Sequence, residues 1–292
     1  MSRAVAALVR QAAGRLAAAG IPSAEHDAWA LFEHATGTAR ARLLLLDDEA
    51  ADGLAGLATF LSYVERRAAR EPLQHITGRA YFRTLTLQVG PGVFTPRPET
   101  ELVAGAAIEA ARLLQSPVVV DLCTGTGAIA LAVATEVPHA QVFAVELDEP
   151  AYEWAARNCA GTSVDLRQGD VADAFHDLDG KADVVVSNPP YIPVDATIRD
   201  PEVAAHDPAL ALWSGPDGLD AIRVVEQVAA RLLRPGGVVV VEHADLQGAS
   251  APEVFLATGR WADVRDHADL NDRPRFVTGR IRDQRREVGA GR

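Results

Sequence analysis

The stretch VVVDLCTGTGA, residues 118–128, decides the fold. Its apolar half reads as a buried strand, and a helical pattern follows from Ile129 to Thr135. Glycines between a strand and a helix let the backbone bend and approach a ligand at the carboxyl end of a sheet. Outward from this stretch, strand and helix patterns alternate through residues 118–242. The alternation predicts an α/β fold with a parallel, doubly wound sheet.

Acidic residues follow the next two predicted strands. The strand at residues 142–146 ends in Glu146, whose carboxylate can accept hydrogen bonds from both hydroxyls of a ribose. The strand at 163–168 is followed by Asp170, which can accept from an adenine amino group, and Val171, which can cover the adenine face. With the glycine loop, these residues predict an adenosine-binding site.

Two nucleotide cofactors compete for this site. Gly125, Gly127 and Ala130 match the loose dinucleotide pattern, and Glu146 lies about where the ribose acid of that pattern falls. Asp121, however, can approach the methionyl part of S-adenosylmethionine (AdoMet), and the chain has no recognisable hydride-transfer site. We therefore expect AdoMet, with S-adenosylhomocysteine as its product. The expected cofactor-binding residues are Asp121, Cys123, Thr124, Gly125, Thr126, Gly127, Glu146, Asp170, Val171 and Asn188.

Four residues after the buried strand at 182–186 carry the predicted chemistry: Asn188, Pro189, Pro190 and Tyr191. An amide or aromatic-amine nitrogen is a poor nucleophile, because its lone pair is delocalised. The Asn188 side-chain oxygen and the Pro189 carbonyl can each accept one of its N–H bonds, and Tyr191 can stack on the planar group. We expect all four residues to bind substrate, and Asn188, Pro189 and Tyr191 to take part in catalysis. The structural alternative is a proline-rich turn that Asn188 caps.

The chain divides into four predicted parts. Residues 1–78 show helical periodicity, with Ser23 as a candidate helix cap, and predict a small helical bundle that docks substrate or only caps the catalytic domain. Residues 79–95 alternate like a β-hairpin linker, and residues 96–282 form the predicted catalytic domain. The polar tail, residues 283–292, is expected to be disordered.

Three further segments have both a structural and a functional interpretation. Residues 95–101 begin a helix with Pro and Glu, and either serve only that start or form a wall beside the cofactor. Residues 193–213 are polar and rich in Pro and Asp, which predicts a loop, over the substrate or merely solvated. For Glu242 and His243, after the last parallel strand, a structural role is favoured over a catalytic one.

Composition limits the class of protein. The formal net charge is −12, and because residues 1–80 contain nine Arg and nine Asp or Glu, all of the excess lies in the predicted catalytic half. An acidic catalytic half argues against direct nucleic-acid binding, which depends on neutralising phosphates. The two cysteines fit neither a disulfide framework nor a zinc spacing, so we expect no metal. With no apolar run of about 18 residues, we expect a cytoplasmic protein without a membrane span.

These motifs together resemble the release-factor glutamine N5-methyltransferases. The resemblance covers nearly the whole chain and includes residues 71–78, 95–101, 121–128 and 188–191, with further matches at 217–220, 234–237 and 273–276. It implies a class I AdoMet-dependent methyltransferase fold, Rossmann-like, with a helical N-terminal domain. It also implies methylation of the side-chain amide of the Gln in the Gly-Gly-Gln motif of class 1 peptide chain release factors.

Two residues depart from the commonest pattern of that family. Cys123 stands where many members have Gly, and Glu146 stands where many have Asp. A small thiol fits at position 123 if the backbone φ there is negative, and Glu keeps the carboxylate with a longer reach. Neither departure is expected to remove the chemistry.

Three alternatives remain open. An adenine-N6 nucleic-acid methyltransferase shares the Asn-Pro-Pro-Tyr motif but normally needs a basic surface. A nicotinamide-dependent oxidoreductase shares only the fold and the glycine loop, and a non-catalytic cofactor-binding protein would keep the motif without turnover.

Overall fold

A computed structural model describes residues 3–43 and 55–283. These residues form two compact units, one up to Arg79 with Ile198–His206 added, the other comprising Ala80–Thr197 and the chain from Asp207 onward. Of the tail expected to be disordered, only Asp283 falls within the described residues. No helix in the described part of the chain is long and apolar enough to cross a membrane.

The first unit is helical. Apolar residues at helical spacing, among them Leu16, Phe32 and Phe60, are completely buried and form its core. Ser23 does precede the second helix, but its side chain makes no capping hydrogen bond, so the predicted cap is wrong. The elements of this unit are α1 (Arg3–Ala18), α2 (Ala24–Thr36), α3 (Arg40–Leu43), α5 (Leu57–Ala68), α6 (Leu73–Thr77) and α10 (Pro201–His206).

The helix α10 comes from the segment that the sequence predicts as a loop. Asp200 accepts a hydrogen bond from the backbone N–H of Glu202 at the helix start, and residues 209–211 add a 3₁₀ turn. Glu202 also accepts from Arg67 on α5 at 2.8 Å, and Arg67 donates to the buried Asp27 at 2.7 Å. The loop prediction is therefore wrong for residues 201–206, because a contact distant in sequence stabilises a helix only six residues long.

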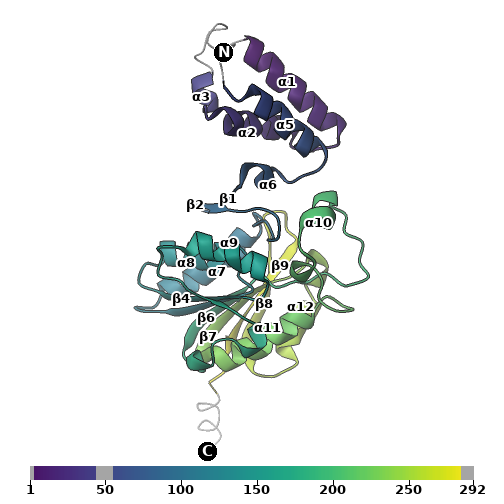
Figure 1. Ribbon diagram of the computed structural model, residues 1–292. Helices are drawn as coiled ribbons and strands as arrows, with labels where there is room; N and C mark the ends of the chain where they lie inside the picture. Colours follow the sequence, from purple (N-terminus) through teal and green to yellow (C-terminus); the bar gives the residue numbers. More distant parts are fainter. Residues whose placement is uncertain (1–2, 44–54, 284–292) are drawn as a thin grey trace, which may run out of the picture. The chain divides into compact units, whose positions relative to one another are not determined.

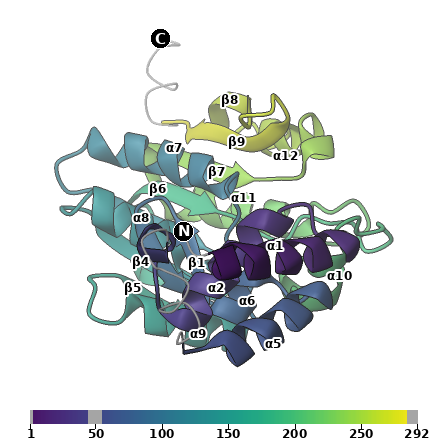
Figure 2. The same ribbon diagram turned by 90° about the horizontal axis from the view of Figure 1, so that it is seen from above.

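The second unit is built on a seven-stranded sheet with the order β5-β4-β3-β6-β7-β9-β8, which Figure 2 shows from β5 at one edge to β8 at the other. The first five strands of this order are parallel, and β9 pairs antiparallel with β7 and β8. The strands are β3 (Val118–Leu122), β4 (Gln141–Glu146), β5 (Asp165–Gln168), β6 (Ala182–Ser187), β7 (Leu233–Glu242), β8 (Trp261–Ala268) and β9 (Pro274–Ile281). The predicted doubly wound α/β fold is confirmed.

Helices cover both faces of this sheet (Figure 1). Alternate strand residues point to opposite faces, so Val119 contributes to one core and Val120 to the other. The first face carries α7 (Thr100–Arg112), α8 (Ala128–Glu136) and α9 (Glu149–Cys159). The second carries α11 (Asp220–Leu232) and α12 (Ser250–Leu256).

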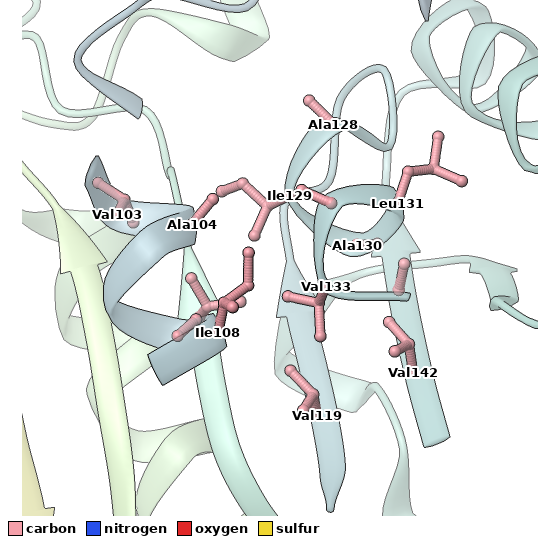
Figure 3. Packing of buried hydrophobic residues seen from close by; sticks show 14 of the residues in the cluster. Val103, Ala104, Ile108, Val119, Ala128, Ile129, Ala130, Leu131, Val133 and Val142 are labelled. Atoms are coloured by element: carbon pink, nitrogen blue, oxygen red, sulfur yellow. The ribbon is translucent and has the colours of Figure 1, made fainter. Parts of the chain in front are cut away.

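The packing of α7 and α8 fixes the start of both helices against the sheet. Figure 3 shows Ile108 of α7 and Val133 of α8 directed toward each other above Val119 of β3. Many of the α8 side chains are alanines, so this helix can lie close to the strands. Thr100 at the start of α7 and the glycine loop before α8 are thereby held on rigid elements.

The predicted hairpin is also present, as β1 (Arg79–Phe82) and β2 (Leu85–Gln88). Its side chains Phe82 and Leu87 are buried in the same core as α7 and α8. Asn158 of α9 joins β2 through hydrogen bonds to the backbone N–H and carbonyl of Gln88, at 2.8 and 2.9 Å. The hairpin therefore belongs to the packed core of the second unit.

Candidate active site

The site lies where the strand order reverses. Strands β3 and β6 are neighbours, although β4 and β5 separate them in the chain, and Leu122 pairs with Ser187 at their carboxyl ends. The Ser187 hydroxyl donates to the Leu122 carbonyl at 2.7 Å. The glycine loop and the Asn-Pro-Pro-Tyr loop therefore leave the sheet side by side, at the switch point where open α/β sheets bind ligands.

Asp121 is completely buried at the end of β3. Its Oδ2 accepts from the Thr124 hydroxyl at 2.6 Å and from the backbone N–H of Ala130 at 3.1 Å. Its Oδ1 is buried and has no hydrogen-bond partner within the described chain. Burial raises the pKa of this carboxyl to about 7, against the opposing hydrogen bonds from Thr124 and Ala130. A buried oxygen without a donor has the capacity to accept a hydrogen bond from a ligand.

The glycine loop has the backbone that its sequence predicts. Gly125 and Gly127 have φ values of 56° and 82°, in the left-handed region that glycine adopts at little cost. A Cβ on Gly125 would meet nothing within 4 Å, whereas one on Gly127 would lie 3.2 Å from Cys159 Sγ. Gly125 thus leaves open space for a ligand, and Gly127 allows α8 to pack against α9. Thr124 and Thr126 of the same loop are buried.

Cys123 also lies in the left-handed region, with φ 60°. The expectation that a thiol fits there was conditional on a negative φ, and this condition is not met. For a residue with a Cβ, the left-handed conformation costs roughly 1–2 kcal/mol. Burial raises the pKa of its thiol, and the charges of Glu146 and Asp121 raise it further, so the sulfur stays protonated.

Glu146 uses its longer side chain to hold the loops at the end of β4. Its Oε2 accepts from the backbone N–H of Gly125 at 2.8 Å, and its Oε1 accepts from Leu147 at 2.9 Å and Asp148 at 3.0 Å. Burial raises its pKa, while these backbone hydrogen bonds lower it. A carboxylate has about four lone-pair sites, so capacity for a ribose hydroxyl remains.

Asp170 and Val171 follow β5, beside the end of β4. The backbone N–H of Gly169 donates to the carbonyl of Glu146 at 2.9 Å, which joins the two loops. Asp170 is exposed and accepts from the backbone N–H of Ala172 through one oxygen at 2.9 Å, and Val171 is buried. The structure thus brings Asp121, Glu146 and Asp170 to consecutive strand ends, and their roles toward a cofactor remain predictions.

Asn188 lies half-buried directly after β6. Its Nδ2 donates to the Thr100 hydroxyl of α7 at 3.2 Å, and no donor in the described chain bonds to its Oδ1. Pro189 is buried and Pro190 half-buried. The amide oxygen expected to accept from the substrate nitrogen is therefore not used by any residue that the structure describes.

Tyr191 extends from the same loop toward β7. Its hydroxyl donates to Oε1 of Glu242 at 3.2 Å, and its ring packs against the core beneath α11 and α12. Burial raises the pKa of Tyr191, with the charge of Glu242 as the next cause, so the phenol stays protonated. Stacking of its ring on a substrate amide remains a prediction.

Three residues of this site were not among the predicted site residues: Thr100, which lies in the segment 95–101, Glu242, for which a structural role was favoured, and Gln247. The Gln247 amide donates to the carbonyls of Tyr191, Asp217 and Gly218 at 3.0–3.3 Å, which joins three loops. Gly218 has φ 75°, and a Cβ there would lie 2.4 Å from the Tyr191 carbonyl oxygen. Residues 217–220 stood out in the sequence only as part of the family resemblance, and Gln247 carried no local signal.

The described chain shows no group of three or more His, Cys, Asp or Glu side chains that could hold a metal ion. His243, next to Glu242, is completely buried, with one ring nitrogen 2.9 Å from Asp266 Oδ1 and the other 2.9 Å from the Ala244 carbonyl. These contacts fit the structural role favoured for His243.

Models of two known protein families match this chain, one in each unit. The model of the PrmC N-terminal domain matches residues 7–78, and that of the methyltransferase small domain matches residues 84–200. Among solved structures, the 16S rRNA N2 G1207 methyltransferase of T. thermophilus, in complex with AdoMet and guanosine, has a TM-score of 0.51 at 21% identity. It covers 70% of this chain and 50% of its own, and supports the class I methyltransferase fold.

Two relatives match most of this chain. The 4-amino-L-phenylalanine/4-methylamino-L-phenylalanine methyltransferase of Streptomyces pristinaespiralis is 47% identical over 73% of this chain and 75% of its own. The release factor glutamine methyltransferase of Streptomyces coelicolor is 58% identical over 93% of this chain and 96% of its own. Because this identity extends through both units, the chain belongs to the release factor glutamine methyltransferase family.

Proposed function

We propose that the protein transfers the methyl group of AdoMet to the side-chain amide nitrogen of the Gln in the Gly-Gly-Gln motif of class 1 peptide chain release factors. The observation that carries this proposal is the pairing of Leu122 with Ser187. It brings the glycine loop next to the Asn-Pro-Pro-Tyr loop, where the Asn188 amide oxygen accepts no hydrogen bond from residues 3–43 and 55–283. The whole-length identity to a release factor glutamine methyltransferase supports the choice of substrate.

The residues at the strand ends suit AdoMet. The buried Oδ1 of Asp121 can accept from its amino group, Glu146 and Asp170 can accept from the ribose and adenine, and the open space at Gly125 lets the cofactor approach the backbone. The bound cofactor supplies an electrophilic methyl group and leaves as S-adenosylhomocysteine. The binding energy toward the charged amino group depends on a carboxylate that is ionised when the cofactor binds.

Asn188 and Pro189 orient the substrate nitrogen. Oδ1 of Asn188 and the Pro189 carbonyl each accept one N–H bond of the glutamine amide, which fixes its plane and favours positive charge on its nitrogen. Proline donates no hydrogen bond and its φ is fixed, so its carbonyl keeps its direction. Well-oriented reactants can gain roughly 7–11 kcal/mol from positioning alone. After transfer the nitrogen loses one N–H proton to solvent water, which leaves a neutral secondary amide.

The helical unit is proposed to dock the protein substrate. The model of the PrmC N-terminal domain matches its residues 7–78, and its helix α10 is formed by the segment that follows the Asn-Pro-Pro-Tyr loop. The two regions proposed to recognise the substrate, the helical unit and residues 193–213, therefore share the helix α10. We propose cytoplasmic action, on a protein and without direct nucleic-acid binding.

The proposal is tested by transfer of labelled methyl from AdoMet to a purified class 1 release factor. Label is expected in the intact factor and not in the same factor with its tripeptide Gln changed to Ala. Label in the Gln→Ala factor, or in neither factor, would contradict the glutamine assignment.

Two further methyl acceptors distinguish this function from the alternative methyltransferase activities. DNA tests the adenine-N6 alternative, which the Asn-Pro-Pro-Tyr motif alone allows. Free 4-amino-L-phenylalanine tests the activity named for the relative at 47% identity. Transfer to either acceptor in place of the release factor would replace the proposed substrate and leave the cofactor site standing.

A further inference from the structure

We propose that Thr100 and Glu242 are positioning residues, which hold the side-chain amide of Asn188 with its oxygen toward the substrate nitrogen. The inference rests on the proposed function, because it concerns the residue proposed to bind the glutamine amide. Thr100 begins α7, Glu242 ends β7 and Asn188 follows β6, so three separate elements meet at this point.

An asparagine amide can be turned in two ways that are similar in shape and opposite in chemistry. Its oxygen accepts hydrogen bonds, whereas its nitrogen donates two. Only the orientation with Oδ1 toward the substrate can accept an N–H bond from the glutamine amide. In the reversed orientation the Nδ2 donor of Asn188 would face the N–H donor of the substrate. A site that uses Asn188 therefore needs a second group that fixes the orientation of its amide.

The Thr100 hydroxyl can fix this orientation only if its own proton is engaged elsewhere. A hydroxyl has one proton to donate and two lone pairs that accept. If it donates to another group, it can only accept from Asn188, and the Nδ2 of Asn188 lies 3.2 Å from it. Thr100 is 3% exposed, so water does not substitute freely for these partners.

In this proposal Glu242 is the acceptor that engages the proton of Thr100. Glu242 is 1% exposed, and its Oε1 accepts from the Tyr191 hydroxyl at 3.2 Å. Burial raises the pKa of the same carboxylate, and the Thr100 side chain lies near enough to it to lower that pKa. A carboxylate is a stronger acceptor than an amide oxygen, so the hydroxyl of Thr100 is directed to Glu242 and away from Asn188. The same carboxylate holds the ring of Tyr191, and both residues of the loop are thus oriented by one group.

The cost of burying Glu242 supports a role of this kind. Burying a carboxylate is unfavourable unless hydrogen bonds or an opposite charge compensate it. The positive charge of Arg275 acts on both Glu242 and Tyr191, but the Glu242 Oε2 and the Arg275 Nε have no hydrogen-bond partner within the described chain. An apolar residue would fill the end of β7 at lower cost, but it could not orient the two hydroxyls.

The test compares Thr100→Val with Thr100→Ser. Valine keeps the shape of threonine and removes the hydroxyl, so we expect kcat for release factor methylation to fall by about 10²-fold, the loss typical of a misplaced reacting group. The Kd for AdoMet is expected to change less than about threefold, and serine is expected to restore kcat to within about threefold. A kcat of Thr100→Val within threefold of the wild type would overturn the proposal, as would a serine variant as slow as the valine variant.

A second measurement does not depend on activity. The chain contains three asparagines, Asn158, Asn188 and Asn271, so asparagine-selective ¹⁵N labelling gives three side-chain amide signals. The variants Asn188→Ala and Asn271→Ala assign these signals. In Thr100→Val and in Glu242→Gln we expect the Asn188 amide signal to shift and its protons to exchange faster, with the Asn271 signal unchanged.

An Asn188 signal that is the same in wild type and both variants would overturn the proposal even if methylation of the release factor is observed. Conversely, a shifted signal in an enzyme that does not label the factor would uphold the positioning of Asn188 and reject the proposed substrate. The two failures are therefore distinguishable.

Discussion

In the first unit the buried Arg67 has carboxylates on two sides, whereas in the second unit the buried Asp121 and Glu242 each keep one oxygen without a hydrogen-bond partner within the described chain. Arg67 also donates to the backbone carbonyl of Glu71 at 3.1 Å. Burial lowers the pKa of Arg67, but its hydrogen bonds to Glu202 and Asp27 outweigh this and raise it. For both carboxylates of the second unit, burial prevails and raises the pKa to about 7.

The difference separates structural charges from functional ones. A buried charge whose partners are all supplied by the fold contributes to holding elements together, here α2, α5 and α10. A buried carboxylate with an open oxygen, that is, one without a hydrogen-bond donor, destabilises the fold until a ligand or a neighbouring side chain donates to it. Such groups are frequent at functional sites. The open carboxylates lie at the ends of β3 and β7, on either side of the β6 end that carries Asn188.

The largest effect is expected from breaking the paired charge of the first unit. Arg67→Met leaves Asp27 buried without its cation, and removal of one partner of a buried pair typically costs 3–5 kcal/mol, so a loss of about that size is expected. The measurement is the free energy of unfolding of the first unit by denaturant titration. Arg15→Met, which removes an exposed pair with Glu65, is the matched control and should cost about 0–1 kcal/mol. Equal losses in the two variants would remove the distinction between buried and exposed pairs.

Asp121→Asn should lower cofactor affinity without lowering stability. It removes a buried charge of similar shape, so the melting temperature is expected to stay equal or rise. The affinity for AdoMet should fall by about 10- to 100-fold, because one charge-assisted hydrogen bond contributes roughly 1.5–3 kcal/mol. Calorimetric titration measures this affinity, and Asp165→Asn, an exposed carboxylate of β5, is the control. Unchanged affinity in Asp121→Asn would mean that the open oxygen does not bind the cofactor.

Stability and AdoMet affinity are expected to depend on pH with opposite signs. Since Asp121 has its pKa raised to about 7, the folded protein binds more protons than the unfolded chain between about pH 4 and 7, and its stability falls as the pH rises through this range. Glu242 contributes in the same direction. AdoMet affinity should instead increase from pH 5.5 to 7, where an α-amino group with a pKa of about 7.7–8.0 stays charged. Asp121→Asn should flatten the affinity profile, and a profile equally steep in the variant would assign it to another group.

The smallest effect is expected at Cys123. Replacement by Gly removes the left-handed strain, so Cys123→Gly should stabilise the second unit by about 1 kcal/mol in thermal unfolding. The same change at Cys159 removes a buried side chain at the end of α9 and should destabilise the unit. Destabilisation by both changes would show that the Cys123 side chain contributes more through packing than its φ costs.

The sequence predicted those features of the fold and the site that depend on residues close together in the chain. The parallel strands, the glycine loop and the placement of Asn188 after a strand all follow from apolar runs and turn residues that lie next to each other in the chain. The alternation of strand and helix predicted the parallel, doubly wound sheet, whereas the order of its strands came from the structure. The predicted fold class and family are confirmed.

What the sequence did not predict depends on contacts distant in the chain. Helix α10 is stabilised by Arg67, which is separated from Glu202 by 135 positions. The hydrogen bond between Asn188 and Thr100 spans 88 positions, and that between Tyr191 and Glu242 spans 51. The positive φ of Cys123 is likewise imposed by the turn and not by the residue, so only the structure could show it.

The central claim is that the ends of β3 and β4 bind the cofactor while Asn188 acts on the substrate nitrogen. Asn188→Ala tests it directly, with turnover on a release factor and AdoMet affinity measured on the same preparation, and Asn271→Ala as the control. The account predicts that turnover is almost abolished while AdoMet affinity falls by less than about threefold, since an amide removed from the reacting centre costs positioning rather than cofactor binding. Comparable losses in turnover and in affinity would contradict it, because the main role of Asn188 would then be to bind the cofactor and not to orient the substrate nitrogen.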